Sequence, residues 1–225
     1  MRAALGRRPT KIPAVFSPLC LYYFDGVSDG ADQSGNARTL TIGTAPSLSG
    51  SLVSGKKAGY AGKYTRTDSA LRLTGAMTAI AVVHTTSLSG TKIVMGCGTP
   101  GASGATNVLW SLGTNGANIR YFAESGASGT DTSLAGAQVL TGEFCMLSLR
   151  RTSGTAISLA VNGVELVTGT CTQPDTGGSS VFSVGADGAG TNPWSAIIDQ
   201  CAVYGSALTD AQLQYLADLA LFGGQ

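Results

Sequence analysis

The stretch that decides the fold lies near the end of the chain, where residues 199–216 read DQCAVYGSALTDAQLQYL. Its first part runs through Cys, Ala, Val and Tyr, a pattern typical of a buried strand. Gly205 and Ser206 then provide a turn signal. Thr209 and Gln212 have the spacing of a capping box, in which each side chain bonds to the backbone N–H of the other residue. The stretch therefore predicts a strand, a tight turn and a helix with a defined start.

Further signals predict the extent and the packing of this helix. Leu208 and Leu213 match a hydrophobic staple, and Asp210 places a negative charge where the helix dipole favours it. Gly223 is suited to ending the helix. One apolar stripe runs along it, formed by Leu213, Leu216, Ala217, Ala220 and Leu221. We expect this stripe to pack against a sheet and to be core rather than a partner groove.

The rest of the chain predicts many short strands and no interleaved helices. Hydrophobic residues make up 43% of the 225 residues, enough for a substantial core, and the 32 glycines suit frequent turns. Asn162 and Gly163 between apolar runs are the strongest short hairpin signal, and the continuously apolar run 77–86 indicates a central strand. Strands are predicted at 21–24, 59–67, 70–75, 77–86, 92–96, 108–112, 119–122, 144–150, 156–161, 164–167, 181–184 and 196–204. This spacing predicts an all-β antiparallel sandwich.

The order of five motifs resembles laminin G-like, or concanavalin A-like, jelly-roll domains. The motifs are YYFDG…DQSGNARTLT (22–41), TGEFCMLSLRR (141–151), ISLAVNGVEL (157–166), FSVGADG…NPWSAIIDQCAVY (182–204) and the closing strand and helix. Phe144 and Cys145 stand where the family usually has Trp-His. The resemblance covers residues 21–222 and implies a jelly-roll sandwich with one short C-terminal helix.

Residues 1–19 are predicted to form an extended N-terminal arm, separate from a jelly-roll domain at 20–225. The arm contains three prolines, and its basic residues are Arg2, Arg7, Arg8 and Lys11. The arm is either a frayed terminus or a strap that docks on a partner, in which case these four residues are the candidate partner-binding residues. Proline and arginine interrupt it too often for a signal peptide, and no apolar run is long enough to span a membrane.

Charge and hydropathy restrict the expected partners. The net charge is +1, which gives no field that would favour nucleic acid. Only 12% of the residues are charged, and the mean hydropathy is +0.19. Either a neutral surface rich in Ser and Thr explains these values, or part of the surface is covered in an assembly. We therefore expect a homo-oligomer, and no membrane or nucleic-acid partner.

The cysteines and the acidic residues bear on chemistry. The five cysteines lie far apart with no C-x-x-C pair, which argues against zinc and favours buried free thiols, although one disulfide remains open. Glycosidases need two carboxylates close together, and the glutamates at 124, 143 and 165 share no strand. His84 is the only histidine, in an apolar run. The sequence therefore predicts no enzyme.

Calcium and glycans are the remaining ligand hypotheses. Asp25, Asp29, Asp32 and Asn36 could supply the oxygen ligands of a structural Ca²⁺ ion, and the resemblance implies that Asp199 could add a carboxylate. Alternatively, these side chains only stabilise turns. Trp110 and Trp194 are the only indoles that could form a sugar platform, and both are predicted to be core.

These observations predict a non-enzymatic structural protein of a virus particle. The expected role is a bacteriophage head decoration or cement protein, made in the host cytoplasm, that docks on a capsid or another virion protein through its arm and its sandwich surface. The alternative is a lectin-like glycan-binding module, for example a receptor-recognising tail appendage.

Overall fold

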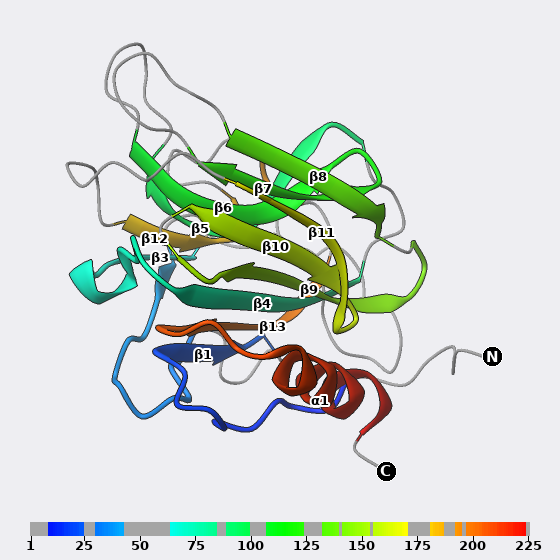
Figure 1. Cartoon of the computed structure of the whole chain (residues 1–225). Coiled ribbons are helices and arrows are strands. Elements are labelled where there is room, and N and C mark those ends of the chain that lie inside the picture. The colour runs from blue at the N-terminus through cyan, green and yellow to red at the C-terminus, as the bar shows by residue number, and fades with distance from the viewer. Residues whose placement is uncertain are drawn as a thin grey trace.

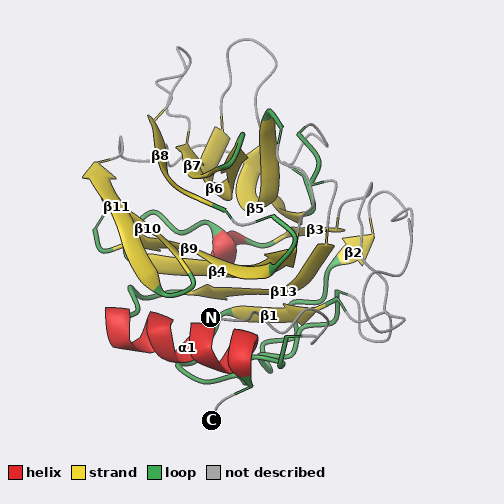
Figure 2. Ribbon diagram, turned by 90° about the vertical axis from the view of Figure 1, so that its right-hand side faces the viewer, coloured by secondary structure: helices red, strands yellow, loops and turns green. Residues whose placement is uncertain are grey.

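The structure is a computed structural model that describes residues 9–24, 30–42, 64–84, 89–99, 107–123, 132–139, 141–153, 155–170, 181–186, 192–194 and 197–223. These residues form two antiparallel β-sheets stacked face to face, with one helix on the outside (Figure 1). Figure 2 shows the resulting layers, with the helix below one sheet and β5–β8 on the far side. The predicted sandwich with a short C-terminal helix is confirmed.

Each sheet combines strands from distant parts of the sequence. Sheet A has the order β1 (Cys20–Tyr23), β13 (Ile197–Tyr204), β4 (Met77–His84), β9 (Phe144–Arg151), β10 (Ala156–Val161) and β11 (Val164–Thr170). Sheet B has the order β2 (Thr41–Ile42), β3 (Tyr64–Thr67), β12 (Val181–Val184), β5 (Thr91–Thr99), β6 (Asn107–Asn115), β7 (Asn118–Ala123) and β8 (Thr132–Gln138). The closing strand β13 thus pairs with the opening strand β1 and with the central strand β4.

The core between the sheets contains both tryptophans, as predicted. Trp110 is fully buried, and its indole N–H donates to the carbonyl oxygen of Leu71 at 3.3 Å. The Trp194 indole N–H donates to the carbonyl oxygen of Ile197 at 3.1 Å. Since a buried indole needs a partner for its N–H, both side chains are satisfied core residues and neither forms a sugar platform.

Helix α1 (Asp210–Phe222) covers the outer face of sheet A with its apolar stripe. The predicted capping box is present: the Gln212 N–H donates to Thr209 Oγ1 at 3.3 Å, and the Thr209 N–H donates to Gln212 Oε1 at 2.8 Å. Gly223 ends the helix in the left-handed region with φ 78°. The start and the end of the helix are both confirmed.

The central strand β4 shows why its sequence is continuously apolar. All eight of its residues are buried, because alternate side chains face the inter-sheet core and the layer under α1. Ala81 and Val83 belong to the first set, whereas Ile80 and Val82 belong to the second. Two covered faces remove the alternation that a half-exposed strand would show. The predicted central position of this strand is confirmed.

The predicted hairpin between β10 and β11 is also confirmed. Asn162 and Gly163 have φ values of 56° and 79°, as a type I′ turn requires. A Cβ atom on Gly163 would lie 2.7 Å from the Cα atom of Gln214 on α1. Glycine is therefore required both by the turn and by the close approach of the helix.

One predicted strand is absent, and two strands of the structure were not predicted. Residues 70–75 are not a strand: Asp68 accepts from the Ala70 N–H at 2.9 Å and caps a short 3₁₀ helix, η1 (Ser69–Leu71). The Arg151 guanidinium then holds the following loop by donating to the carbonyl oxygens of Leu73 and Gly75. Strands β2 and β8 had no sequence signal, because β2 has two residues and β8 is rich in small residues.

The described part of the predicted arm lies on the sandwich. Residues 9–13, the N-terminal strap, run along the outer face of sheet A beside α1, where the colour bar of Figure 1 marks them dark blue. Ile12 is 1% exposed and packs among the apolar residues between sheet A and α1. Burial of the Ile12 side chain therefore helps to hold this segment on the sandwich.

Cysteine burial agrees with the sequence for the four cysteines that can be described. Cys20, Cys97, Cys145 and Cys201 are buried free thiols, and Cys171 lies outside the described residues. Burial raises the pKa of Cys20 and of Cys97 to about 12, which keeps both thiols protonated and unreactive. Within the described ranges, no helix combines the length and the apolar character needed to cross a membrane.

Candidate functional site

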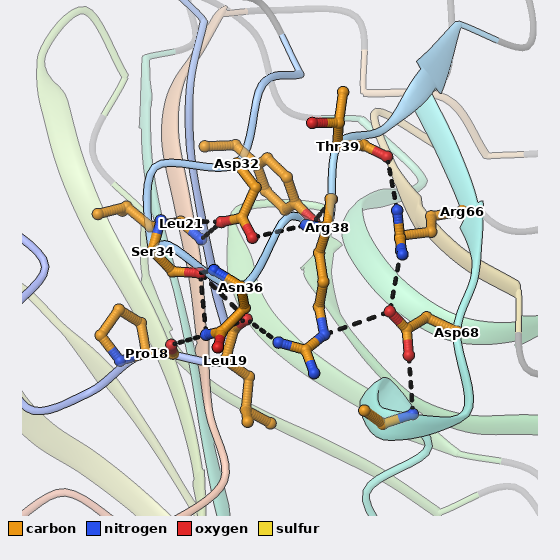
Figure 3. A network of polar contacts seen from close by, with 12 residues as sticks. Pro18, Leu19, Leu21, Asp32, Ser34, Asn36, Arg38, Thr39, Arg66 and Asp68 are labelled. Carbon is orange, nitrogen blue, oxygen red and sulfur yellow. Dashed lines mark hydrogen bonds and ion pairs between the residues drawn. The ribbon is translucent and has the colours of Figure 1, made fainter.

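The polar loop predicted to bind calcium is held by hydrogen bonds from the chain itself (Figure 3). Asp32 Oδ1 accepts from the backbone N–H of Leu21 at 3.1 Å and of Ser34 at 2.9 Å, and Oδ2 accepts from Arg38 at 2.8 Å. Partial burial alone would raise the pKa of Asp32, but the N–H groups of Ser34 and Arg38 outweigh it and lower the pKa. This carboxylate is thus the centre of a turn.

Asn36 and Arg38 extend the same network toward β1 and β3. The Asn36 side-chain amide donates to the carbonyl oxygens of Pro18 at 3.0 Å and of Leu19 at 3.1 Å. The Arg38 guanidinium donates to the Leu19 carbonyl oxygen at 2.8 Å, and its Nε lies 3.2 Å from Asp68 Oδ2 (Figure 3). The Arg38 guanidinium therefore links the Leu19 carbonyl oxygen to the Asp68 carboxylate. A metal ion bound between these two oxygen groups would have to displace it.

The described residues of this loop do not fit a calcium ion well. Calcium needs six to eight oxygen ligands, whereas the Asp32 oxygens already accept three N–H groups and the Asn36 amide nitrogen faces the carbonyls of 18 and 19. No three His, Cys, Asp or Glu residues of the described chain form a metal-binding group. Asp199 is 5% exposed on β13, and Asp25 and Asp29 lie outside the described residues. Calcium binding stays a prediction.

The predicted partner-binding residues are only partly described. Arg2, Arg7 and Arg8 lie outside the described residues. The Lys11 ammonium lies 4.8 Å from the centre of the Tyr23 ring, a cation–π contact between the strap and β1. Lys11 therefore takes part in holding the strap on its own sheet.

The residues considered for catalysis have packing and ion-pair roles. The His84 ring lies 5.1 Å from the Phe144 ring and is 8% exposed. Glu165 on β11 forms an ion pair with Arg150, which also pairs with Asp210 at the start of α1. Glu124 lies outside the described residues. A fold alone does not decide between an enzyme and a binding domain.

A hollow on the outer face of sheet B is the candidate binding site. On β7, Ile119, Tyr121 and Ala123 turn toward the core, so Arg120 and Phe122 face outward. On β12, Phe182 and Val184 turn inward, which places Ser183 on the outer face as well. The cavity has a volume of about 260 Å³ and is lined from β5, β6, β7 and β12. We call it the sheet B hollow; its polar side chains are Thr91, Ser111, Arg120, Ser183 and Asn192.

The floor of the sheet B hollow is polar but fully satisfied. Ser183 is fully buried and donates to the Ala186 carbonyl oxygen at 2.9 Å. Ser111, 3% exposed, donates to the Phe122 carbonyl oxygen at 3.1 Å. Ser183 has no exposed surface, so of the two hydroxyl oxygens only that of Ser111 can present a lone pair to a ligand. The floor is held in place by its own hydrogen bonds.

The rim of the hollow carries a positioned cation. The Arg120 guanidinium donates to Thr91 Oγ1 at 3.1 Å and lies 4.8 Å from the centre of the Phe122 ring. An aromatic ring under a guanidinium fixes the plane of that group. Arg120 and Phe122 are both half-buried, and Asn192 is exposed. The rim thus offers a charged donor, an amide and an apolar ring edge.

Gly96 lets β5 and β6 pack closely at the floor of the sheet B hollow. A Cβ atom on Gly96 would lie 2.8 Å from both the Ser111 Cβ and the Trp110 carbonyl oxygen. The register of β5 against β6 shifts on both sides of this position, between Ile93 and Met95 and between Cys97 and Gly98. Such bulges bend a sheet locally and often lie beside binding sites. The hollow therefore depends on Gly96 having no side chain.

Sequence reasoning missed this site, although one part of it was visible. The alternation in the predicted strand 119–122 places Arg120 and Phe122 on the same face. Ser111 and Ser183 are 72 residues apart, and their strands are not direct neighbours in sheet B, since β5 lies between them. Only the topology brings them together.

Comparisons with known proteins agree with this fold. A laminin G family model, described as the concanavalin A-like lectin/glucanases superfamily, matches residues 57–214. A search of curated proteins found no match. Domain 4 of AbnA, a GH43 extracellular arabinanase from Geobacillus stearothermophilus solved with arabinotriose, is 21% identical with a TM-score of 0.65, over 89% of this chain and 98% of that one.

Two further solved structures have a similar fold. The CBM40 of the Ruminococcus gnavus IT-sialidase, bound to α2,6 sialyllactose, is 14% identical with a TM-score of 0.55, over 66% of this chain and 86% of that one. The binding domain of botulinum neurotoxin DC in complex with SialylT is 11% identical with a TM-score of 0.64, over 90% of this chain and 51% of that one. At these identities the likeness shows the fold alone. The family match and the two-sheet architecture together show that this chain belongs to the concanavalin A-like lectin/glucanases superfamily.

Proposed function

We propose that this protein is a non-enzymatic, lectin-like module that binds a glycan in the sheet B hollow. The observation that carries the proposal is the arrangement of Ser111, Ser183 and Arg120 around one cavity on the outer face of a sheet. The similar domains solved with arabinotriose and with sialyllactose support a carbohydrate as the ligand.

The chemistry of the hollow suits a sugar. Binding sites of small ligands combine apolar contact area with a few fixed polar groups. Phe122 supplies the apolar surface, Ser111 supplies an acceptor, and Arg120 and Asn192 supply donors for ring and hydroxyl oxygens. A carboxylate-bearing sugar would gain a charge-assisted bond from Arg120.

The residues of the hollow also support the non-enzymatic part of the proposal. Glycoside hydrolysis requires a pair of carboxyl groups at the scissile bond. The described residues that line the hollow include no aspartate and no glutamate. We therefore expect binding without turnover, which an assay of glycan products over several days would check.

Glycan-array screening followed by calorimetry tests the proposal with matched variants. Arg120→Met should weaken binding of the identified glycan about tenfold, because a charge-assisted hydrogen bond is lost. Lys92→Met, on the same sheet but not lining the hollow, is the matched control and should bind as the unchanged protein does. Equal affinity of all three proteins for the glycan would place the site elsewhere, and a complete lack of glycan binding would overturn the proposal.

The virion role expected from the sequence stays a prediction. The similar domains named above are binding domains, and the described part of the arm that was expected to dock on a partner lies on its own sheet. Sedimentation with purified capsids would test the decoration role directly. A glycan-binding tail appendage would satisfy both the virion expectation and the lectin-like proposal.

A further inference from the structure

The N-terminal strap is bound like a separate extended peptide. The Gln200 side chain pairs with its backbone twice, because Oε1 accepts from the Ile12 N–H at 2.6 Å and Nε2 donates to the Thr10 carbonyl oxygen at 2.7 Å. The Thr10 N–H donates to the Ala220 carbonyl oxygen at 2.8 Å, and the Tyr23 hydroxyl donates to the Ile12 carbonyl oxygen. Four hydrogen bonds thus hold the backbone of the strap at Thr10 and Ile12.

The groups that contact the strap lie outside the segment that connects the strap to β1. We call the place where they hold the strap the groove. It lies between β13 and the last turn of α1, and its wall includes Tyr204 and Ala220. Ala220 belongs to the end of α1, where helix carbonyls lack partners within the helix, and the strap supplies one. Ile12 provides the apolar anchor at 1% exposure. Any chain carrying residues 9–13 can make the same contacts.

The connection between the strap and β1 is strained. Phe16 and Ser17 are consecutive non-glycine residues with φ values of 60° and 52°. L-residues rarely adopt this left-handed region, and almost never in succession. The turn also leaves Phe16 partly exposed, at 38%, against the exposed ring of Tyr215. The closed hinge therefore costs free energy that an extended hinge would not.

We propose that two copies of this chain exchange their N-terminal straps and form a symmetric dimer. Residues 9–13 of each copy occupy the groove of the other, and residues 14–18 form an extended hinge of up to about 17 Å. Exchange keeps every strap contact with the groove and releases the left-handed turn. Short hinges under strain favour this kind of exchange, which needs no new interface.

Hinge variants analysed by sedimentation velocity test the proposal. Ser17→Pro should strengthen the dimer at least tenfold, because proline cannot adopt φ 52° and the closed turn is then blocked. Phe16→Gly/Ser17→Gly should weaken the dimer at least tenfold, because glycine adopts this region freely. Ser206→Gly is the matched control, since Ser206 is exposed and lacks a positive φ. A protein that stays monomeric even as Ser17→Pro overturns the proposal.

Complementation by native mass spectrometry separates strap exchange from any other dimer. Ile12→Asp prevents its own strap from binding, and Gln200→Leu removes the pairing groups of its own groove. Each variant alone should be monomeric. Their mixture should form a heterodimer, in which the intact strap of Gln200→Leu occupies the intact groove of Ile12→Asp. A mixture that gives no heterodimer, or single variants that dimerise as the unchanged protein does, would rule out exchange.

Discussion

The two outer faces of the sandwich differ in a way that separates stability from binding. The outer face of sheet A is covered by α1 and the N-terminal strap, and residues such as Ile80 and Val82 are buried there. The outer face of sheet B instead carries glycines, serines and Arg120 around a cavity of about 260 Å³. One face adds to the apolar core, while the other carries the polar groups of the proposed glycan site. A two-sheet domain can therefore assign one outer face to each task.

Removing an apolar contact under α1 should have the largest effect on stability. Leu216 is fully buried between the helix and sheet A. Leu216→Ala should lower the free energy of unfolding by about 2–5 kcal/mol, because it removes buried apolar area and leaves a cavity. Chemical denaturation measures this loss. Glycan affinity of the folded protein should be unchanged, and a parallel loss of affinity would contradict the separation of the two faces.

Adding one carbon to the floor of the sheet B hollow should affect both stability and binding. Gly96→Ala places a Cβ 2.8 Å from Ser111 and from a backbone oxygen, so the strands must move apart. We expect a cost of about 1–3 kcal/mol and a loss of glycan affinity. Gly75→Ala is the matched control, since nothing lies within 4 Å of its Cβ position. Denaturation and calorimetry on both variants make the comparison, and unaltered affinity of Gly96→Ala would separate the floor from the binding site.

The polar loop beside β1 should depend on Arg38 and be insensitive to calcium. Arg38→Met removes the hydrogen bond to the Leu19 carbonyl oxygen and the ion pair with Asp68, and should cost about 1–2 kcal/mol. Thermal melting with excess EDTA and with excess Ca²⁺ should give the same Tm, because the described oxygen atoms of Asp32 already accept N–H groups. A rise in Tm with Ca²⁺ would instead support the metal site predicted from the sequence.

Acid should weaken the same loop, with the smallest effect of the four. The pKa values of Asp32 and Asp68 lie below the ordinary value of 3.8: burial opposes the shift, but hydrogen bonds from Ser34 and from Arg66 outweigh it. The stabilisation is complete above the unfolded pKa near 4 and is lost as the pH falls through the lower folded values. Melting between pH 5 and pH 2 should therefore show a smaller decrease in Tm for Asp32→Asn than for the unchanged protein. An equal decrease would assign the acid sensitivity to other groups.

The sequence predicted the layers of the fold better than the site. The helix ends, the Asn162-Gly163 turn and the central strand β4 depend on neighbours in sequence, and all were found. The contact of the strap with its own sheet was not predicted, because the backbone N–H of Ile12 pairs with Gln200, which lies 188 residues away. The sheet B hollow was missed for the same reason, since its serines meet only through strand order. Local chemistry can be predicted from local sequence, whereas a cavity is a property of the assembled sheets.

The hydrogen bond from Thr10 to Ala220 brings the two described ends of the chain together on the helix-bearing side of the molecule. Sheet B, whose strands β5, β6 and β7 supply lining residues of the hollow, lies on the other side of the sandwich (Figure 2). A support or a label attached near residue 9 or residue 223 would therefore lie on the side away from the proposed glycan site. Coupling there is the natural format for screening sugars against the protein.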